Sequence, residues 1–158
     1  MLGRITVNLV FPTSAPPEAV WAALESPQRW PDVQYDLTRA CIEPDGVLRA
    51  GATMRTWARP GTAAVDMSYR VIEAQKPSRL AIEVGGAGLH FRGRTEYTIE
   101  GDGAGSRVTI KSDIEPVLWL HKITTALARG WYTALMTANM RARIQPALTL
   151  AEKIAAEG

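Results

Sequence analysis

The sequence predicts an α+β fold in which a seven-stranded antiparallel sheet curves around one long C-terminal helix, with two short helices after the first strand. Three observations indicate this fold: a strictly alternating segment near the N-terminus, six further alternating segments separated by short turns, and a final helical segment without a partner helix. The 158 residues suffice for one hydrophobic core, and no linker, repeat or low-complexity segment divides them. We therefore expect residues 1–158 to form a single domain.

The first predicted element is a strand over residues 4–11. A short helix follows, with Ser14 as its N-cap and two prolines in its first turn, where a missing N–H has no consequence. This helix ends before Pro27, because the residue preceding a proline disfavours the α conformation. A second helical turn, around Trp30, is stopped by Pro31. The inward face of the strand carries Ile5, Val7, Leu9 and Phe11.

Six more strands are predicted between these helices and the C-terminal segment. Asp-Gly and glycine-rich connections separate them, and such connections between alternating segments are typical of β-hairpins. We therefore expect strands that are neighbours in sequence to pair antiparallel. The predicted strands cover residues 37–43, 52–59, 63–73, 79–84, 89–100 and 107–115.

Residues 117–156 predict one long amphipathic helix, because their apolar residues recur at steps of three and four. At 1.5 Å per residue it would measure roughly 60 Å, longer than a small domain is wide. Its apolar face must therefore lie on the inner face of the sheet. Pro146 is expected to kink or break the helix near residues 143–145, and Gly130 to add a softer bend. Arg141 and Arg143 are assigned to the solvent face.

The inward face of the predicted sheet is mostly apolar but also carries hydroxyl groups, a mixture that is typical of small-molecule pockets. We therefore expect a cavity of several hundred Å³ between the sheet and the long helix. Gly93, an inward position, is expected to leave room there for a larger side chain. The predicted ligand-binding residues are Trp30, Met54, Met67, Tyr69, Phe91, Thr95, Tyr97, Ile110, Ser112, Leu120, Ile123, Leu127 and Trp131.

Local motifs add a resemblance to this pattern. Ala-Val-Trp-Ala-Ala-Leu at 19–24 is followed by Arg-Trp-Pro-Asp-Val at 29–33, and Gly51 precedes the third strand. Val-Ile-Glu at 71–73 leads to Pro-Ser-Arg-Leu at 77–80. Over essentially its whole length the chain resembles the START/Bet v 1-like (SRPBCC) superfamily, in particular its polyketide cyclase/dehydrase and lipid-transport group. The resemblance implies a helix-grip fold, a cavity for a hydrophobic ligand, and Trp30 near the mouth of that cavity.

The residues that could carry catalysis form no recognisable constellation. The two histidines, His90 and His121, are far apart and lack carboxylates at ligand spacing, so neither a metal nor another cofactor is expected. Cys41 has no neighbouring base, and the glycine cluster at 85–88 predicts a hairpin loop rather than a phosphate site. The side chains that could handle protons inside the cavity are Tyr69, Tyr97 and Ser112.

Three functions remain open at this point. The first is a carrier that binds a lipid, a polyketide-like compound or an aromatic molecule. The second is a cyclase or dehydratase that uses the tyrosine, serine and threonine hydroxyls of the cavity. The third is a protein-interaction module, which a large exposed apolar patch would favour. Trp57, on the outward face between Arg55 and Arg59, either marks a homodimer surface or stacks on a guanidinium.

Composition excludes other classes of partner. A net charge of +2, spread evenly, is too small to predict nucleic-acid binding. No segment approaches the roughly 20 apolar residues that span a bilayer, and the N-terminus has no signal-peptide core, so stable membrane insertion is not expected. The single cysteine, Cys41, excludes an internal disulfide and fits a reducing compartment. The expected location is the cytoplasm.

Overall fold

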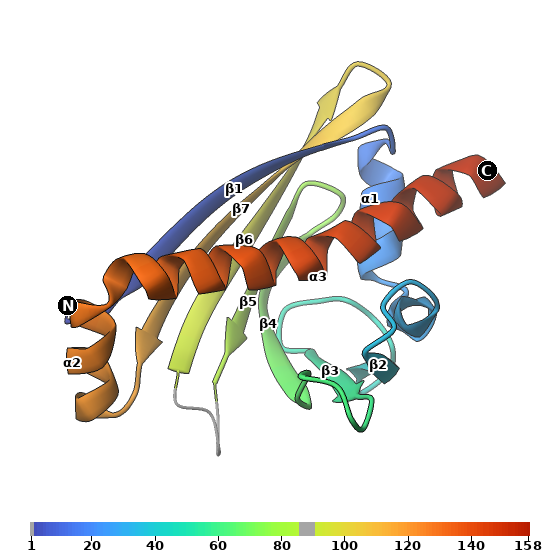
Figure 1. Cartoon of the computed structure of the whole chain (residues 1–158). Coiled ribbons are helices and arrows are strands. Elements are labelled where there is room, and N and C mark those ends of the chain that lie inside the picture. The colour runs from blue at the N-terminus through green and yellow to red at the C-terminus, as the bar shows by residue number, and fades with distance from the viewer. Residues whose placement is uncertain (1, 86–90) are drawn as a thin grey trace.

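In the computed structural model, which describes residues 2–85 and 91–158, a long helix lies across the concave side of a curved seven-stranded sheet (Figure 1). The predicted fold class is confirmed, including two short helices after the first strand. The strands are β1 (Ile5–Thr13), β2 (Leu37–Glu43), β3 (Thr53–Ala58), β4 (Met67–Gln75), β5 (Arg79–Val84), β6 (Phe91–Asp102) and β7 (Gly105–Pro116). The helices are α1 (Pro17–Leu24), the 3-10 helix η1 (Pro27–Asp32), α2 (Trp119–Leu127) and α3 (Arg129–Glu157).

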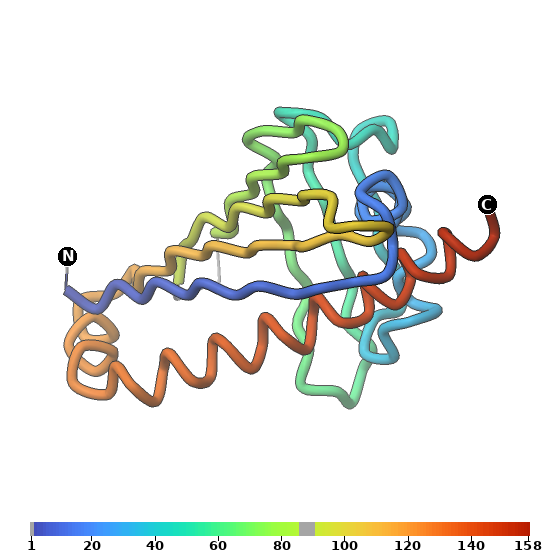
Figure 2. The backbone as a smooth tube through the Cα atoms, turned by 90° about the horizontal axis from the view of Figure 1, so that it is seen from above, coloured from blue at the N-terminus to red at the C-terminus, as the bar shows by residue number. Residues whose placement is uncertain are grey.

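Every neighbouring pair of strands is antiparallel, in the order β1-β7-β6-β5-β4-β3-β2. The strands from β2 to β7 therefore follow the chain, whereas β1 pairs with β7 at the opposite edge from β2. The helices α1 and η1 carry the chain from one edge to the other, and the view in Figure 2 shows them at the same end of the molecule as the C-terminus.

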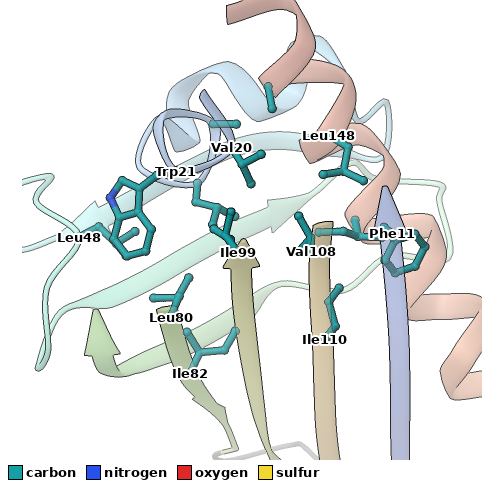
Figure 3. Close-up of a cluster of buried hydrophobic side chains, with 14 of the residues drawn as sticks. Phe11, Val20, Trp21, Leu48, Leu80, Ile82, Ile99, Val108, Ile110 and Leu148 are labelled. Carbon is teal, nitrogen blue, oxygen red and sulfur yellow. The ribbon is translucent and has the colours of Figure 1, made fainter. Parts of the chain in front are cut away.

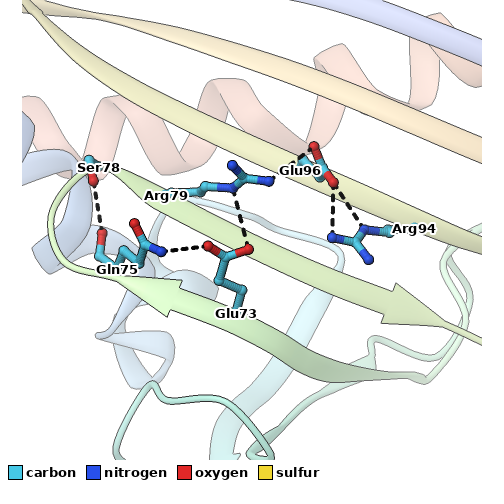
Figure 4. A network of polar contacts seen from close by, with 6 residues as sticks. All are labelled: Glu73, Gln75, Ser78, Arg79, Arg94 and Glu96. Carbon is cyan, nitrogen blue, oxygen red and sulfur yellow. Dashed lines mark hydrogen bonds and ion pairs between the residues drawn. The ribbon is translucent and has the colours of Figure 1, made fainter.

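The outer face of the sheet is covered by charged pairs, as the alternation of its strands predicts. On this face Arg79 contacts both Glu73 and Glu96, and Glu96 also binds Arg94 (Figure 4). The amide of Gln75 donates to Glu73 at 2.7 Å. These contacts, of which those of Arg79 join neighbouring strands, keep the outer face in solvent and leave the inner face to meet the helices.

The hydrophobic core lies where α1, the C-terminal half of α3 and one end of the sheet meet (Figure 3). Trp21 of α1 is 1% exposed, and its indole N–H donates to Glu25 at 3.1 Å. Leu148 of α3 is buried in the same cluster as Ile99 and Val108 of the sheet. Packing therefore fixes the C-terminal half of α3 on α1, and the salt bridge of Arg29 to Glu157 attaches its last turn to η1.

The long C-terminal helix differs from its prediction, because it is two helices. The break falls at Ala128, whose φ of −106° and ψ of 33° are not helical. Pro146, which was expected to kink or break the helix, lies inside α3 and does not break it. A proline removes one backbone hydrogen bond, but Ile144 and Leu148 on either side are buried, and their packing holds the helix together.

Candidate ligand-binding site

A cavity of about 290 Å³ lies between the inner face of the sheet and the middle of α3. Strands β2 to β7 form one wall, α3 forms the other, and α1, η1 and the residues after η1 contribute to the lining. The indole N–H of Trp30 donates to the carbonyl of Ala23 at 2.8 Å, which fixes this side chain beside the cavity. The lining is mostly apolar and includes Leu37, Leu80, Ile82, Val84, Ile114, Met136, Met140 and Ile144.

Nine of the thirteen predicted ligand-binding residues line this cavity. They come from the sheet and from η1, where alternation along a strand and the position of one tryptophan were sufficient to place them. The nine are Trp30, Met54, Met67, Tyr69, Phe91, Thr95, Tyr97, Ile110 and Ser112.

The four predicted residues of the C-terminal helices do not line the cavity. Leu120, Ile123, Leu127 and Trp131 are 55%, 38%, 84% and 63% exposed. The prediction assumed one continuous helix whose apolar face meets the sheet along its whole length, but the break at Ala128 gives α2 a different direction (Figure 1). The cavity wall on α3 instead begins at Met136 and ends at Ala147.

Arg143 was predicted to lie on the solvent face and not at the site. It is solvent-exposed, as expected, but it also lines the cavity, and its Nη1 donates to the phenol oxygen of Tyr69 at 2.5 Å. A cation thus stands where an apolar cavity meets solvent. Its spacing was a usable signal, because Arg143 follows Met136 and Met140 at seven and three residues and so shares their helix face.

Two tyrosines, Tyr69 and Tyr97, line the cavity and interact electrostatically. The pKa of Tyr97 is raised to about 12, mainly by burial and also by the neighbouring Tyr69, against the lowering effect of Arg143. Burial also raises the pKa of Tyr69, against the opposing effect of Arg143. Both phenols are therefore neutral hydrogen-bond donors and acceptors at physiological pH.

Two hydroxyl groups, on the adjacent strands β6 and β7, add to the polar lining of the cavity. Thr95 and Ser112 are directly paired in the register, and their side-chain oxygens are 2.9 Å apart. Because each hydroxyl has the other as its partner, the pair can lie in an apolar wall at little cost.

Gly93 does not provide the space that was expected of it. A Cβ atom built there would lie 2.9 Å from the backbone oxygen of Asp113 and 3.1 Å from Cγ1 of Ile114. The position faces inward, but β6 and β7 approach each other too closely there for a side chain to reach the cavity.

The remaining predicted features fall outside the cavity. Trp57 lies under the guanidinium groups of Arg39 and Arg55, at 4.7 Å and 5.6 Å from its ring centre, so the stacking interpretation holds. The imidazole of His121 stacks on Phe91 at 6.2 Å. His90 and the glycines after Gly85 are outside the described residues. Within residues 2–85 and 91–158, no three His, Cys, Asp or Glu side chains are placed to hold a metal ion.

Comparison with known proteins identifies the family. The model of the polyketide cyclase / dehydrase and lipid transport family matches residues 4–144, from β1 to the middle of α3. The chain belongs to this family. The match includes every strand and most of the cavity wall on α3. Among curated proteins none matches the sequence. No helix in the described residues is both long and apolar enough to cross a membrane.

Solved structures share the fold at low sequence identity. Ara h 8.0201 is 10% identical with a TM-score of 0.71, and the match covers 98% of this chain and 99% of that one. Norcoclaurine synthase from Thalictrum flavum, in complex with dopamine and hydroxybenzaldehyde, is 14% identical over 95% of this chain and 87% of that one, with a TM-score of 0.68. The di-domain ARO/CYC StfQ of steffimycin biosynthesis is 12% identical with a TM-score of 0.75; 97% of this chain matches 52% of that one.

Proposed function

We propose that this protein binds a compact, mostly apolar small molecule that carries an anionic group. The observation that carries the proposal is the position of Arg143, whose guanidinium stands beside a cavity with an otherwise mostly apolar lining. An apolar pocket with a few oriented polar groups is the usual form of a small-molecule site. A carboxylate or phenolate in such a pocket would be paired by Arg143, as a buried charge requires.

The size of the cavity favours an aromatic or polyketide-like ligand over a long-chain lipid. At about 290 Å³ it lies at the lower end of ordinary ligand pockets, which hold roughly 300–1,000 Å³. The phenol rings of Tyr69 and Tyr97, with Phe91, also offer aromatic surface for edge or stacked contacts. The small aromatic molecules in the solved norcoclaurine synthase complex agree with a ligand of this class.

The test is calorimetric titration with naphthoate, with naphthalene-methanol, which has the same ring without the charge, and with palmitate. We expect naphthoate to bind most tightly. Replacing Arg143→Gln should weaken naphthoate binding at least about tenfold, since hydrogen bonds to charged groups contribute about 1.5–3 kcal/mol. The same change should leave naphthalene-methanol binding nearly unaltered.

Arg141→Gln is the matched control for this experiment. Arg141 is on the same helix, but its guanidinium lies 5.6 Å from the ring centre of Phe11, away from the cavity. Both variants lose one positive charge from α3, so a difference between them reports the position of Arg143 at the cavity. Equal weakening by both substitutions, or tighter binding of palmitate than of naphthoate, would contradict the proposal.

A second candidate function is a cyclase or dehydratase, favoured by the phenol of Tyr97. In the described part of the chain no protein group is hydrogen-bonded to its hydroxyl, which adjoins the cavity. In a dehydration, the neutral phenol can donate its proton to the departing hydroxyl, which leaves as water. Solvent water takes the α-proton and later returns a proton to the phenolate, while Arg143 stabilises the developing enolate.

An aryl-substituted β-hydroxy ketone provides the test of this second function. Mass spectrometry would follow the loss of water from the ketone in the presence of the protein. Turnover that disappears in Tyr97→Phe while binding is retained would support an enzyme. No turnover above the rate in buffer would leave binding alone as the proposed function.

We also infer a cytoplasmic location from one residue type. Cys41 is free, and the sequence holds no second cysteine with which it could pair. Free thiols persist in reducing compartments, whereas oxidising ones favour disulfides. Fractionation of the producing cells tests the inference, and recovery of the protein outside the cell would contradict it.

A further inference from the structure

One end of the molecule carries a row of exposed apolar side chains that the ligand cavity does not use. We call it the apolar ridge; it comprises Trp119, Leu120, Ile123, Leu127, Trp131 and Leu135. These residues belong to α2 and the first turns of α3, and both helix segments lie at the end of the molecule opposite the C-terminus (Figures 1 and 2). Trp119 alone is 71% exposed.

The ridge faces away from the protein because α2 is attached by its opposite side. Thr125 is completely buried, and α2 packs against β7. Near the first turns of α2, a Cβ at Gly3 would lie 2.8 Å from the carbonyl oxygen of Lys122, so the chain is closely packed there. The side chains of the ridge are therefore held outward by a fixed helix. Monomeric proteins rarely gather many large exposed apolar side chains on neighbouring helix segments unless these bind a partner.

Charge identifies the kind of partner. Between Pro116 and Ala151 the sequence contains no Asp or Glu, while Lys122 and Arg129 accompany the ridge. Neither of these two cations forms an ion pair within residues 2–85 and 91–158. The nearest acidic residue before the ridge, Glu115, is already paired with Arg92. The ridge thus combines apolar and cationic groups without anionic ones.

We propose that the apolar ridge docks the protein on an anionic lipid surface. Helices that lie in a membrane interface combine tryptophan and leucine on one face with lysine and arginine beside them. Trp119, Leu127 and Trp131 would enter the boundary between headgroups and acyl chains, and Lys122 and Arg129 would contact lipid phosphates. A second copy of this chain is a poorer occupant, because a symmetric contact would bring these cations together without an acidic partner.

Co-sedimentation with vesicles tests the proposal, using phosphatidylcholine alone and an equimolar mixture with phosphatidylglycerol. We expect binding to the mixed vesicles and much weaker binding to phosphatidylcholine. The double variant Lys122→Gln/Arg129→Gln should bind the mixed vesicles about thirtyfold more weakly. Raising the salt concentration should weaken the binding of the unmodified protein as well. The control Lys111→Gln/Lys153→Gln removes the same charge from β7 and the far end of α3 and should bind normally.

A second variant, Trp119→Ser/Leu127→Ser, removes apolar surface from the ridge and should also abolish vesicle binding. These side chains are exposed and lie outside the cavity, so thermal stability and naphthoate binding should not change. Failure of this proposal is therefore distinguishable from failure of the proposed ligand site. Absence of binding to mixed vesicles, or equal binding to both kinds, would overturn it. Sedimentation velocity showing a dimer that the Trp119→Ser/Leu127→Ser variant dissociates would overturn it in favour of a second copy.

Discussion

At the scale of single residues, burial keeps the phenol of Tyr97 neutral beyond the pH at which a tyrosine ordinarily ionises. Its pKa rises from 10.0 to about 12, with burial as the main cause. In the unfolded chain the same phenol would lose its proton near the ordinary value. The folded state therefore binds more protons than the unfolded state between these two pKa values.

This difference predicts a pH dependence of stability. The contribution of Tyr97 is fully present below pH 10 and is lost as the pH rises toward 12, because the unfolded state then gains from deprotonation. Denaturant unfolding at several pH values in this window should show a shallower decline for Tyr97→Phe than for the unmodified protein. Parallel declines would show that the phenol titrates normally in the folded state.

Gly93 shows what strand alternation does and does not predict. Alternation assigns the residue to the inner face, correctly, but it gives no information on how closely the neighbouring backbone approaches. That distance depends on the local pairing of β6 with β7, in which Gly93 lies opposite Ile114. The cavity prediction for this one residue was wrong for that reason.

A pair of glycine substitutions checks this point. Gly93→Ala should lower the free energy of unfolding by about 1–3 kcal/mol, since the backbone oxygen of Asp113 cannot move away easily. Gly130→Ala is the control, because its Cβ would meet nothing within 4 Å, and it should raise stability by up to about 1 kcal/mol through helix propensity. Urea denaturation measures both. Equal stability of the two variants would mean that the strands separate at little cost.

At the scale of elements, α3 has three consecutive environments. Its first turns, with Trp131 and Leu135, are exposed; residues from Met136 to Ala147 line the cavity; and Leu148, Leu150 and Ala151 are in the core. The apolar periodicity of the sequence is nearly continuous through all three. A helix period identifies which residues share a face, but not whether that face meets a core, a cavity or solvent.

Substitution of two leucines in the C-terminal helices, one in the core and one in solvent, measures how much each environment contributes to stability. Leu148→Ala should destabilise the protein by about 2–5 kcal/mol, because the side chain is 4% exposed and leaves a cavity in the core. Leu127→Ala should change stability by less than about 0.5 kcal/mol, since that side chain is already in solvent. Chemical denaturation gives both values. A large loss from Leu127→Ala would show that α2 packs more closely than the structure indicates.

The strands could be predicted well, whereas the helix break was underestimated as a soft bend. Residues 37–43 and 79–84 were predicted with the bounds of β2 and β5, because turn residues and alternation act locally. Ala128 itself carries no helix-breaking chemistry. Gly130, where only a soft bend was predicted, lies two residues beyond it, inside α3. Pro146 does carry helix-breaking chemistry, but the helix continues through it, with Ile144 and Leu148 buried on either side. The sheet wall of the site was therefore predictable, and the helix wall was not.

At the scale of the whole molecule, the cavity means that a bound ligand can add to the stability of the folded state. A ligand that fills it binds the folded state alone, so it should raise the melting temperature. Naphthoate at a hundred times its Kd should add about 2.7 kcal/mol, equivalent to about 5–10 °C for a chain of this size. Melting followed by circular dichroism tests this, and Arg143→Gln should reduce the shift at the same ligand concentration. No shift at saturating naphthoate would contradict binding in the cavity.

The pairing of β1 with β7 also determines the order in which the chain can assemble. Ile5 lies opposite Ile114, so the first strand to be synthesised must wait for the last. At ordinary translation rates that interval is roughly 5–20 s. Strands β2 to β7 can meanwhile form as successive hairpins, each from neighbouring residues. The amphipathic β1 segment thus stays without its partner strand for most of synthesis, and its addition to β7 completes the sheet before α3 packs on α1.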